Sequence, residues 1–151
     1  MIKYMNLIGI KARKASEYKV TTEVKNKVLN DYAKLIKNEK KFIINQNSKD
    51  INYARKKGLK ENLIKRLHLN ENKLDGIINS ILKIAKLRDP IDSTLEKWKR
   101  PNGLNIKRVS IPIGVIGVIY ESRPNVTSDV ASLCFKSGNV VILKGGSEAI
   151  N

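Results

Sequence analysis

The sequence predicts an α/β chain in which amino-terminal helices lead into one β-α-β unit of an open, incomplete parallel sheet. Two apolar runs, at 111–120 and 139–144, are separated by about one helix length, as in parallel strands joined by a crossover helix. Before Pro90, apolar residues recur mainly at helical spacing. Both runs end in polar residues, at the sheet edge where open α/β sheets bind ligands.

Helical periodicity predicts five segments before Pro90, namely 5–19, 23–45, 48–58, 61–67 and one starting at Asn70. Thr22 and Ser48 are candidate N-caps because their hydroxyls can accept a hydrogen bond from the first helical turn. The last segment has the clearest apolar stripe, formed by Leu74, Ile77, Ile78, Ile81, Leu82 and Ala85. The second is expected to be one long helix, with apolar positions at Val24, Val28, Tyr32, Leu35, Ile36 and Phe42.

The pattern changes after residue 90. Residues 91–111 are expected to form a β-arm around the turn signal Pro101-Asn-Gly103, with Val109, Ile111 and Ile113 on a half-buried strand. From Gly114 the run is continuously apolar, as in a strand covered on both faces. A helix over 125–137, capped by Thr127 or Ser128, should precede the strand at 140–143. We therefore divide the chain into 1–90, 91–111 and 112–151.

Composition narrows the function classes. Apolar residues make up 41% of the 151 residues, which is enough for a packed domain. The net charge of +16, from 30 Lys and Arg against 14 Asp and Glu, fits either an anionic partner or a compositional bias. The cations are spread along the chain without interleaved aromatic residues, so nucleic acid is not expected as the primary partner. No apolar run is long enough to cross a membrane as a helix.

The polar residues after each strand are the candidates for chemistry. After the first strand, the Asn125 amide is suited to stabilise an oxyanion and Arg123 to hold a carboxylate or phosphate. Alternatively, Asn125 caps the next helix and Arg123 is a surface cation. After the second strand, Lys144 can reach phosphate or ribose hydroxyls and Glu148 can accept from ribose. A plain strand-to-helix turn explains Lys144-Gly-Gly146 equally well.

Other reactive side chains are less promising. Cys134 lies between Leu133 and Phe135 and is expected in the core rather than as a nucleophile. As a lone cysteine it forms no internal disulfide, which fits a reducing, cytoplasmic location. His68 has no partner at metal-ligand spacing and is expected on the surface. No metal site is predicted.

Longer strings of sequence indicate a family. Pro112 to Val126 and Ser137 to Ala149 closely resemble γ-glutamyl phosphate reductase (glutamate-5-semialdehyde dehydrogenase) of the aldehyde dehydrogenase superfamily. Ala54-Arg-Lys-Lys-Gly-Leu59, Arg66-Leu67 and Leu87-Arg-Asp-Pro90 are similar to the same family. Within the superfamily, the string Tyr-Glu-Ser-Arg-Pro-Asn is specific to these reductases.

The resemblance implies an incomplete Rossmann-like, NAD(P)-binding, aldehyde dehydrogenase-like domain and NADPH-dependent reduction of L-glutamyl 5-phosphate in proline biosynthesis. In this family a cysteine thiolate attacks the acyl phosphate, phosphate leaves, and hydride from NADPH reduces the thioester to glutamate 5-semialdehyde. It implies that Asn125 contacts the oxyanion and that Arg123 contacts substrate. The implied cofactor contacts are Ile119, Tyr120, Glu121, Ser122, Lys144, Ser147 and Glu148.

The resemblance also implies a homo-oligomer, with contacts through the β-arm, and glutamate 5-kinase as a partner. The family's catalytic cysteine lies far downstream, and Cys134 does not match it. We therefore expect an amino-terminal part of a larger enzyme that is inactive alone. The alternatives are the reductase module of a bifunctional pyrroline-5-carboxylate synthase and a non-enzymatic, basic nucleic-acid-binding module.

Overall fold

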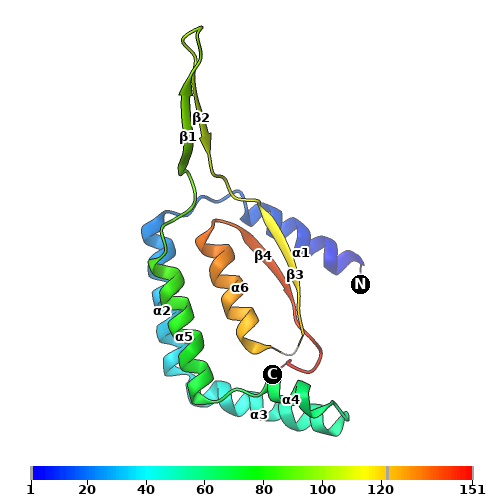
Figure 1. The fold of residues 1–151 in the computed structure, drawn as a ribbon. Helices are drawn as coiled ribbons and strands as arrows, with labels where there is room; N and C mark the ends of the chain where they lie inside the picture. The colour runs from blue at the N-terminus through cyan, green and yellow to red at the C-terminus, as the bar shows by residue number, and fades with distance from the viewer. Residues whose placement is uncertain (1, 122, 151) are drawn as a thin grey trace.

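The computed structural model describes residues 2–121 and 123–150, which form a helical layer, a two-stranded parallel sheet and a projecting hairpin (Figure 1). The helices are α1 Ile2–Ala15, α2 Thr22–Asn38, α3 Lys40–Lys56, α4 Glu61–Leu67, α5 Glu71–Lys86 and α6 Pro124–Lys136. The strands are β1 Thr94–Lys99, β2 Asn105–Val109, β3 Val115–Ile119 and β4 Val140–Lys144. None of the helices in these ranges has the length and apolarity to span a membrane.

The main core lies where α2, α5 and α6 pack together. The Asn70 side chain caps α5 by accepting a hydrogen bond from the Lys73 amide, at the start that the sequence predicts for this helix. Nearly all of the predicted α5 stripe is buried, and Ile81 is completely excluded from solvent. Burying one such side chain stabilises the fold by about 1.5–3 kcal/mol. This helix is therefore the centre of the helical layer.

A second cluster joins α3 to α4 through Ile51, Ala54, Ile64 and Leu67. The buried Asn47 side chain fixes the segment after α4. Its Nδ2 donates to the Leu67 carbonyl at 2.9 Å, and its Oδ1 accepts from the Leu69 amide at 2.7 Å. The predicted helix at 61–67 is confirmed with the same bounds.

The predicted long helix at 23–45 is wrong, because the chain bends at Glu39 and α3 begins at Lys40. Glu39 has φ −94° and ψ 11°, outside the helical minimum, and no Gly or Pro marks the bend. Packing of α3 on α4 favours the new direction. Ser48 is consequently not an N-cap; it lies inside α3, where its hydroxyl donates to the Ile44 carbonyl.

The buried face of α2 follows its apolar positions only in part. Thr21, rather than Thr22, caps the helix by accepting from the Val24 amide. The buried positions are Lys25, Leu29, Ala33 and Ile36, whereas Val24, Val28 and Leu35 are exposed, as is Phe42 in α3. The contact with α5 selects this face. Similarly, α1 ends at Ala15 rather than residue 19 and buries only Ala12, because its main contact is with β4.

The β3-α6-β4 unit is observed, with β3 and β4 parallel as expected. α6 lies to one side of the two strands and α1 to the other (Figure 1). β3 is nevertheless only partly covered, and Ile119 at its end is 81% exposed. The expectation of a strand buried on both faces is therefore wrong for β3.

The start of α6 differs from the prediction. The helix begins at Pro124, whose fixed φ and missing amide hydrogen suit the first helical position. Neither Thr127 nor Ser128 is the N-cap. The Ser128 hydroxyl donates back to the Asn125 carbonyl at 2.9 Å. Asn125 lies inside the first turn, so the alternative that it caps this helix is wrong as well.

The predicted arm is the antiparallel β1–β2 hairpin, which projects from the body (Figure 1). Gly103 in its turn has φ 86°, a conformation that favours glycine. Every residue of the two strands is exposed except Ile106, which is partly buried. Ile111 and Ile113 are also exposed and follow β2 as irregular chain, which contradicts the predicted half-buried strand.

Candidate functional site at the carboxyl end of the parallel strands

The parallel register brings the two predicted groups of polar residues together. Ile119 is the register partner of Lys144, and the Tyr120 amide extends the ladder by donating to the Lys144 carbonyl at 3.1 Å. The segment after β3 and the turn after β4 therefore leave the same edge of the sheet. Ser122, another predicted contact, lies outside the described residues.

Tyr120 links these segments. Its hydroxyl is 2.5 Å from the Thr127 hydroxyl on α6, and its ring lies against Gly145. A Cβ added to Gly145 would be 3.4 Å from the Tyr120 hydroxyl oxygen. This is an ordinary van der Waals distance, so the turn after β4 packs against the Tyr120 ring and is thereby tied to β3 and α6.

Beside the end of β3 is an open cavity of about 450 Å³. Its charged lining consists of Glu121 and Arg123, which follow β3, and Arg66, which belongs to α4. Its remaining lining residues are Leu63, Ile119, Tyr120 and Val126. Arg123 is exposed, and it faces this cavity rather than open surface alone. The cavity is therefore lined by two arginines and one glutamate together with mainly apolar residues.

Asn125 lines a neighbouring cavity of about 320 Å³, which shares Arg66 with the first. The Asn125 amide nitrogen donates to Asp129 Oδ2 at 3.1 Å, and Asp129 Oδ1 accepts from the Ser80 hydroxyl at 3.0 Å. These bonds orient the amide from both α5 and α6. An amide nitrogen carries two hydrogens, so the second remains able to donate to a bound group.

The turn after β4 contains the other predicted contacts. Lys144 and Ser147 are exposed, and Glu148 is partly buried. The Glu148 carboxylate lies so close to Gly146 that a Cβ there would be 2.1 Å from one of its oxygens. Lys144 and Ser147 carry hydrogen-bond donors and Glu148 carries an acceptor.

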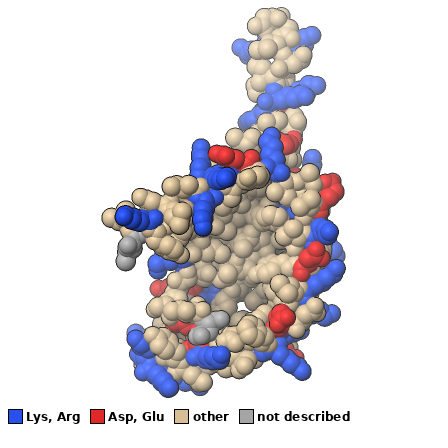
Figure 2. All heavy atoms as spheres, turned by 180° about the vertical axis from the view of Figure 1, so that it is seen from behind, with Lys and Arg blue, Asp and Glu red and all other residues tan. Residues whose placement is uncertain are grey.

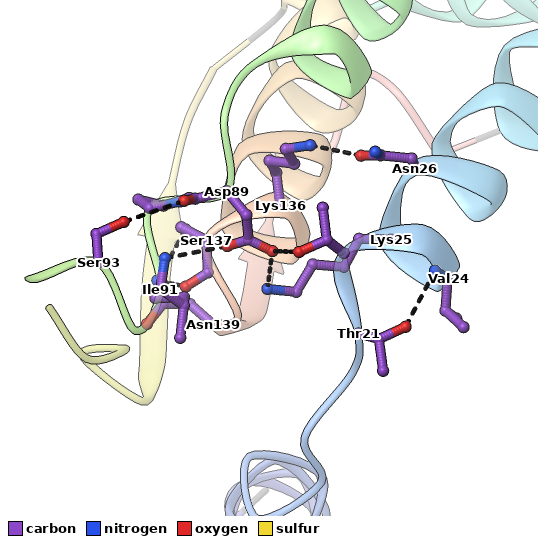
Figure 3. Close-up of polar contacts among 12 residues, drawn as sticks. Thr21, Val24, Lys25, Asn26, Asp89, Ile91, Ser93, Lys136, Ser137 and Asn139 are labelled. Carbon is purple, nitrogen blue, oxygen red and sulfur yellow. Dashed lines mark hydrogen bonds and ion pairs between the residues drawn. The ribbon is translucent and has the colours of Figure 1, made fainter.

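A buried polar cluster lies at the opposite end of the strands (Figure 3). Lys25 Nζ is 2.8 Å from Asp89 Oδ2, and the two side chains are 4% and 11% exposed. Burial disfavours the charged form of Asp89, but hydrogen bonds from Lys25, the Ile91 amide and Thr22 outweigh it and hold the pKa of Asp89 below its usual value. The cluster joins α2 to the segment that leads into the hairpin.

Lys136 extends this cluster from α6 and is only 3% exposed. Its ammonium donates to the Ala85 carbonyl at 2.9 Å, at the last turn of α5, and also to the Asn26 side chain. The polar cluster thus fixes α6, and with it the candidate site, against the helical layer.

Cys134 is buried, as predicted, and burial raises the pKa of its thiol. A raised pKa disfavours the nucleophilic thiolate. His68 is exposed, as predicted, and its carbonyl accepts from Lys73 Nζ at 2.6 Å. Within residues 2–121 and 123–150, no three His, Cys, Asp or Glu side chains are grouped as metal ligands.

Two cations of the site were not predicted from the sequence. Arg66 and Lys73 lie on α4 and α5, far from either strand in the sequence, and only the fold brings them to these cavities. On the face shown in Figure 2 the cations do not form one patch. Figure 2 shows Lys and Arg around the margin of the body and on the hairpin, with an uncharged hollow in the centre of that face.

No protein-family model matches the chain. The chain is, however, similar to proteins named γ-glutamyl phosphate reductase. It is 48% identical to that of Halothermothrix orenii over 149 residues, which cover 95% of this chain and 36% of the relative. The identity with the Clostridium tetani protein is 46% over 151 residues, covering 99% and 35%.

Solved structures of γ-glutamyl phosphate reductases have the same fold in the matching region. The Thermotoga maritima structure gives a TM-score of 0.87 at 42% identity, covering 92% of this chain and 34% of that one. The Saccharomyces cerevisiae structure gives 0.92 at 34% identity, covering 96% and 38%. The chain spans about a third of the length of these relatives.

Proposed function

Because the chain is homologous to γ-glutamyl phosphate reductases over about a third of their length, we propose that it is part of an enzyme that reduces L-glutamyl 5-phosphate to L-glutamate 5-semialdehyde and phosphate. The observation that carries this proposal is the similarity in sequence and fold over nearly the whole chain. The polar strand ends, brought together by the Ile119–Lys144 register, support it.

We propose that β3, α6 and β4 begin a Rossmann-like, aldehyde dehydrogenase-like domain that binds NADPH. Lys144 and Ser147 donate to the adenosine ribose or its phosphate, and Glu148 accepts from a ribose hydroxyl. Ile119, Tyr120 and Glu121 line the nicotinamide side. NADPH, when bound, supplies the hydride.

In this proposal Asn125 donates to the oxyanion, in an orientation set by its bond to Asp129. Arg123 holds an anionic group of the substrate in the adjoining cavity. The buried Cys134 thiol takes no part. The nucleophile is a cysteine outside these 151 residues.

The proposal is tested with purified protein in both directions, by following NADPH absorbance. A full-length protein containing this segment is expected to reduce NADP when given glutamate 5-semialdehyde and phosphate. Residues 1–151 alone are expected to show no turnover in either direction. An inactive full-length protein would exclude the proposed reaction. Activity of residues 1–151 alone would instead show that the nucleophile lies within these residues.

Two substitutions in the full-length protein distinguish the role proposed for the end of β3 from the role proposed for the end of β4. Asn125→Ala is expected to lower kcat by about 100-fold or more, because an oxyanion donor acts in the transition state. Lys144→Met is expected mainly to raise KM for NADP, because its contact is with the cofactor. Lys37→Met, on the exposed side of α2, is the control and should change neither constant. Exchange of the two effects would show that the strand ends are assigned wrongly.

A further inference from the structure

We infer that Arg66 binds the α-carboxylate of the amino-acid substrate and thereby positions it beside the end of β3. This inference rests on the proposed function, and it adds a residue from the helical layer to the site. Arg66 borders both cavities at the candidate site, one of which is also lined by Glu121 and the other by Asn125.

The backbone of Arg66 is held firmly although its side chain is exposed. Its neighbours in α4, Ile64 and Leu67, are 4% and 0% exposed. Asn47 then fixes the end of this helix through the Leu67 carbonyl and the Leu69 amide. The guanidinium is therefore presented from an anchored helix. In the described part of the chain, no ion pair occupies it.

The charges around Arg66 favour an amino-acid head group. Its own cavity contains a second guanidinium, from Arg123, and the Glu121 carboxylate. A carboxylate bound by Arg66 and an ammonium group near Glu121 satisfy both signs of charge. A phosphate dianion in the same place would pair with the two arginines but would bring no positive group to Glu121. Lys73 lines only the neighbouring cavity, where its ammonium donates to the His68 and Lys65 carbonyls.

The geometry of the side chain also favours this role. A guanidinium is planar and binds a carboxylate through two parallel hydrogen bonds, which fix orientation as well as position. Arg66 and Asn125 border one cavity, so a substrate held at its α-carboxylate extends from Arg66 toward the proposed oxyanion donor. Arg66 is thus a substrate-positioning residue.

The test uses the full-length protein in the direction of semialdehyde oxidation, where semialdehyde and phosphate are varied independently. Arg66→Met is expected to raise KM for semialdehyde by about tenfold or more, since a hydrogen bond to a charged group is lost. KM for phosphate and for NADP should stay within about twofold. Arg66→Lys keeps the positive charge but loses the two parallel hydrogen bonds of the guanidinium, so its KM for semialdehyde should be intermediate. Arg55→Met, an exposed arginine on α3, is the matched control.

A second measurement does not depend on turnover. L-Glutamate carries the amino-acid head group without a phosphoryl group, and its binding is measured by calorimetry. The wild type and Arg55→Met should bind it equally, and Arg66→Met about tenfold or more weakly. Thermal melts check that each variant is folded. If Arg66→Met is not folded, glutamate binding is measured with Arg66→Lys instead.

A rise in KM for phosphate instead of semialdehyde would overturn the inference, and so would unchanged glutamate binding in both Arg66 variants. If the wild type binds L-glutamate through Arg66 but has no turnover, the proposed reaction fails while the carboxylate site stands. If the protein is active but neither Arg66 variant changes KM for semialdehyde or the binding of glutamate, the proposed reaction stands and the carboxylate site at Arg66 is wrong.

Discussion

The carboxylate of Asp89 accepts hydrogen bonds from Lys25, from the Thr22 hydroxyl and from the Ile91 amide (Figure 3). A single side chain thus connects the start of α2 to the segment between α5 and β1. An ion pair buried to this extent is not a large net source of stability, but removing one partner leaves the other charge buried and uncompensated. Asp89 should therefore be sensitive even to an isosteric change.

We expect Asp89→Asn to lower the free energy of unfolding by about 3–5 kcal/mol at pH 7, because Lys25 is left without a buried counter-charge. Urea unfolding followed by circular dichroism measures the change. The control is Asp31→Asn, whose 3.7 Å pair with Lys34 is exposed at 56% and 76% and should contribute at most about 1 kcal/mol. Equal effects of the two substitutions would contradict this role for the buried pair.

The same carboxylate predicts a pH dependence. The pKa of Asp89 is lower in the folded protein than in the unfolded chain, where it is about 3.9. Its contribution is therefore complete above that unfolded value and is lost as pH falls through the folded pKa. Urea midpoints should show the difference between wild type and Asp89→Asn shrinking below about pH 4. If the difference in stability between wild type and Asp89→Asn grows as the pH falls, the pKa of Asp89 is not lowered in the folded protein.

At the scale of single helices, the sequence predicts best where a local signal and the packing agree. Asn70 marks the start of α5, and its apolar stripe is buried as expected. The bend at Glu39 has no local breaker and depends on the contact between α3 and α4. Apolar spacing alone does not give the buried face of α2 for a related reason: Val24 and Val28 are exposed and Lys25 is buried, because the position of α5 decides which face is covered.

The end of α6 gives a prediction at this scale. Gly138 has φ 68°, and a Cβ there would be 3.2 Å from Pro112 Cγ and 3.4 Å from Ile91 Cγ1. Gly138→Ala should therefore destabilise the protein by about 1 kcal/mol or more, through backbone strain and crowding. Gly76→Ala, inside α5 with no atom within 4 Å of the new Cβ, should instead stabilise by roughly 0.5–1 kcal/mol. Thermal melts compare them, and shifts of the same sign would contradict the argument.

At the scale of the whole molecule, the strand ends could be placed together from the sequence, because parallel strands share a carboxyl edge. Asn125 and Lys144 were predicted on this basis, and the register brings their segments together. Arg66 could not be placed in this way, since its position depends on how α4 docks against the β-α-β unit. Predicting the roles of these residues required the family resemblance in addition to the geometry.

The hairpin is the feature whose explanation lies outside the single chain. A two-stranded hairpin is at best marginally stable alone in water, and this one exposes Leu95 at 60% and Trp98 at 38%. We propose that a second copy of the protein covers it, which corresponds to the expected role of the β-arm. In the full-length protein, Trp98→Glu should then reduce the oligomer mass measured by light scattering.

Burying a carboxylate in such a contact is costly, so dissociation should occur while far-UV circular dichroism of the body stays unchanged. Lys97→Glu, next to Trp98 on the same strand and pointing to the other side of the hairpin, changes the charge by two units and is the control. Loss of the oligomer in both variants would indicate a general effect of charge on the arm. An unchanged mass with Trp98→Glu would show that the hairpin is not the contact, because an aromatic residue at the centre of an interface cannot become an anion without weakening it.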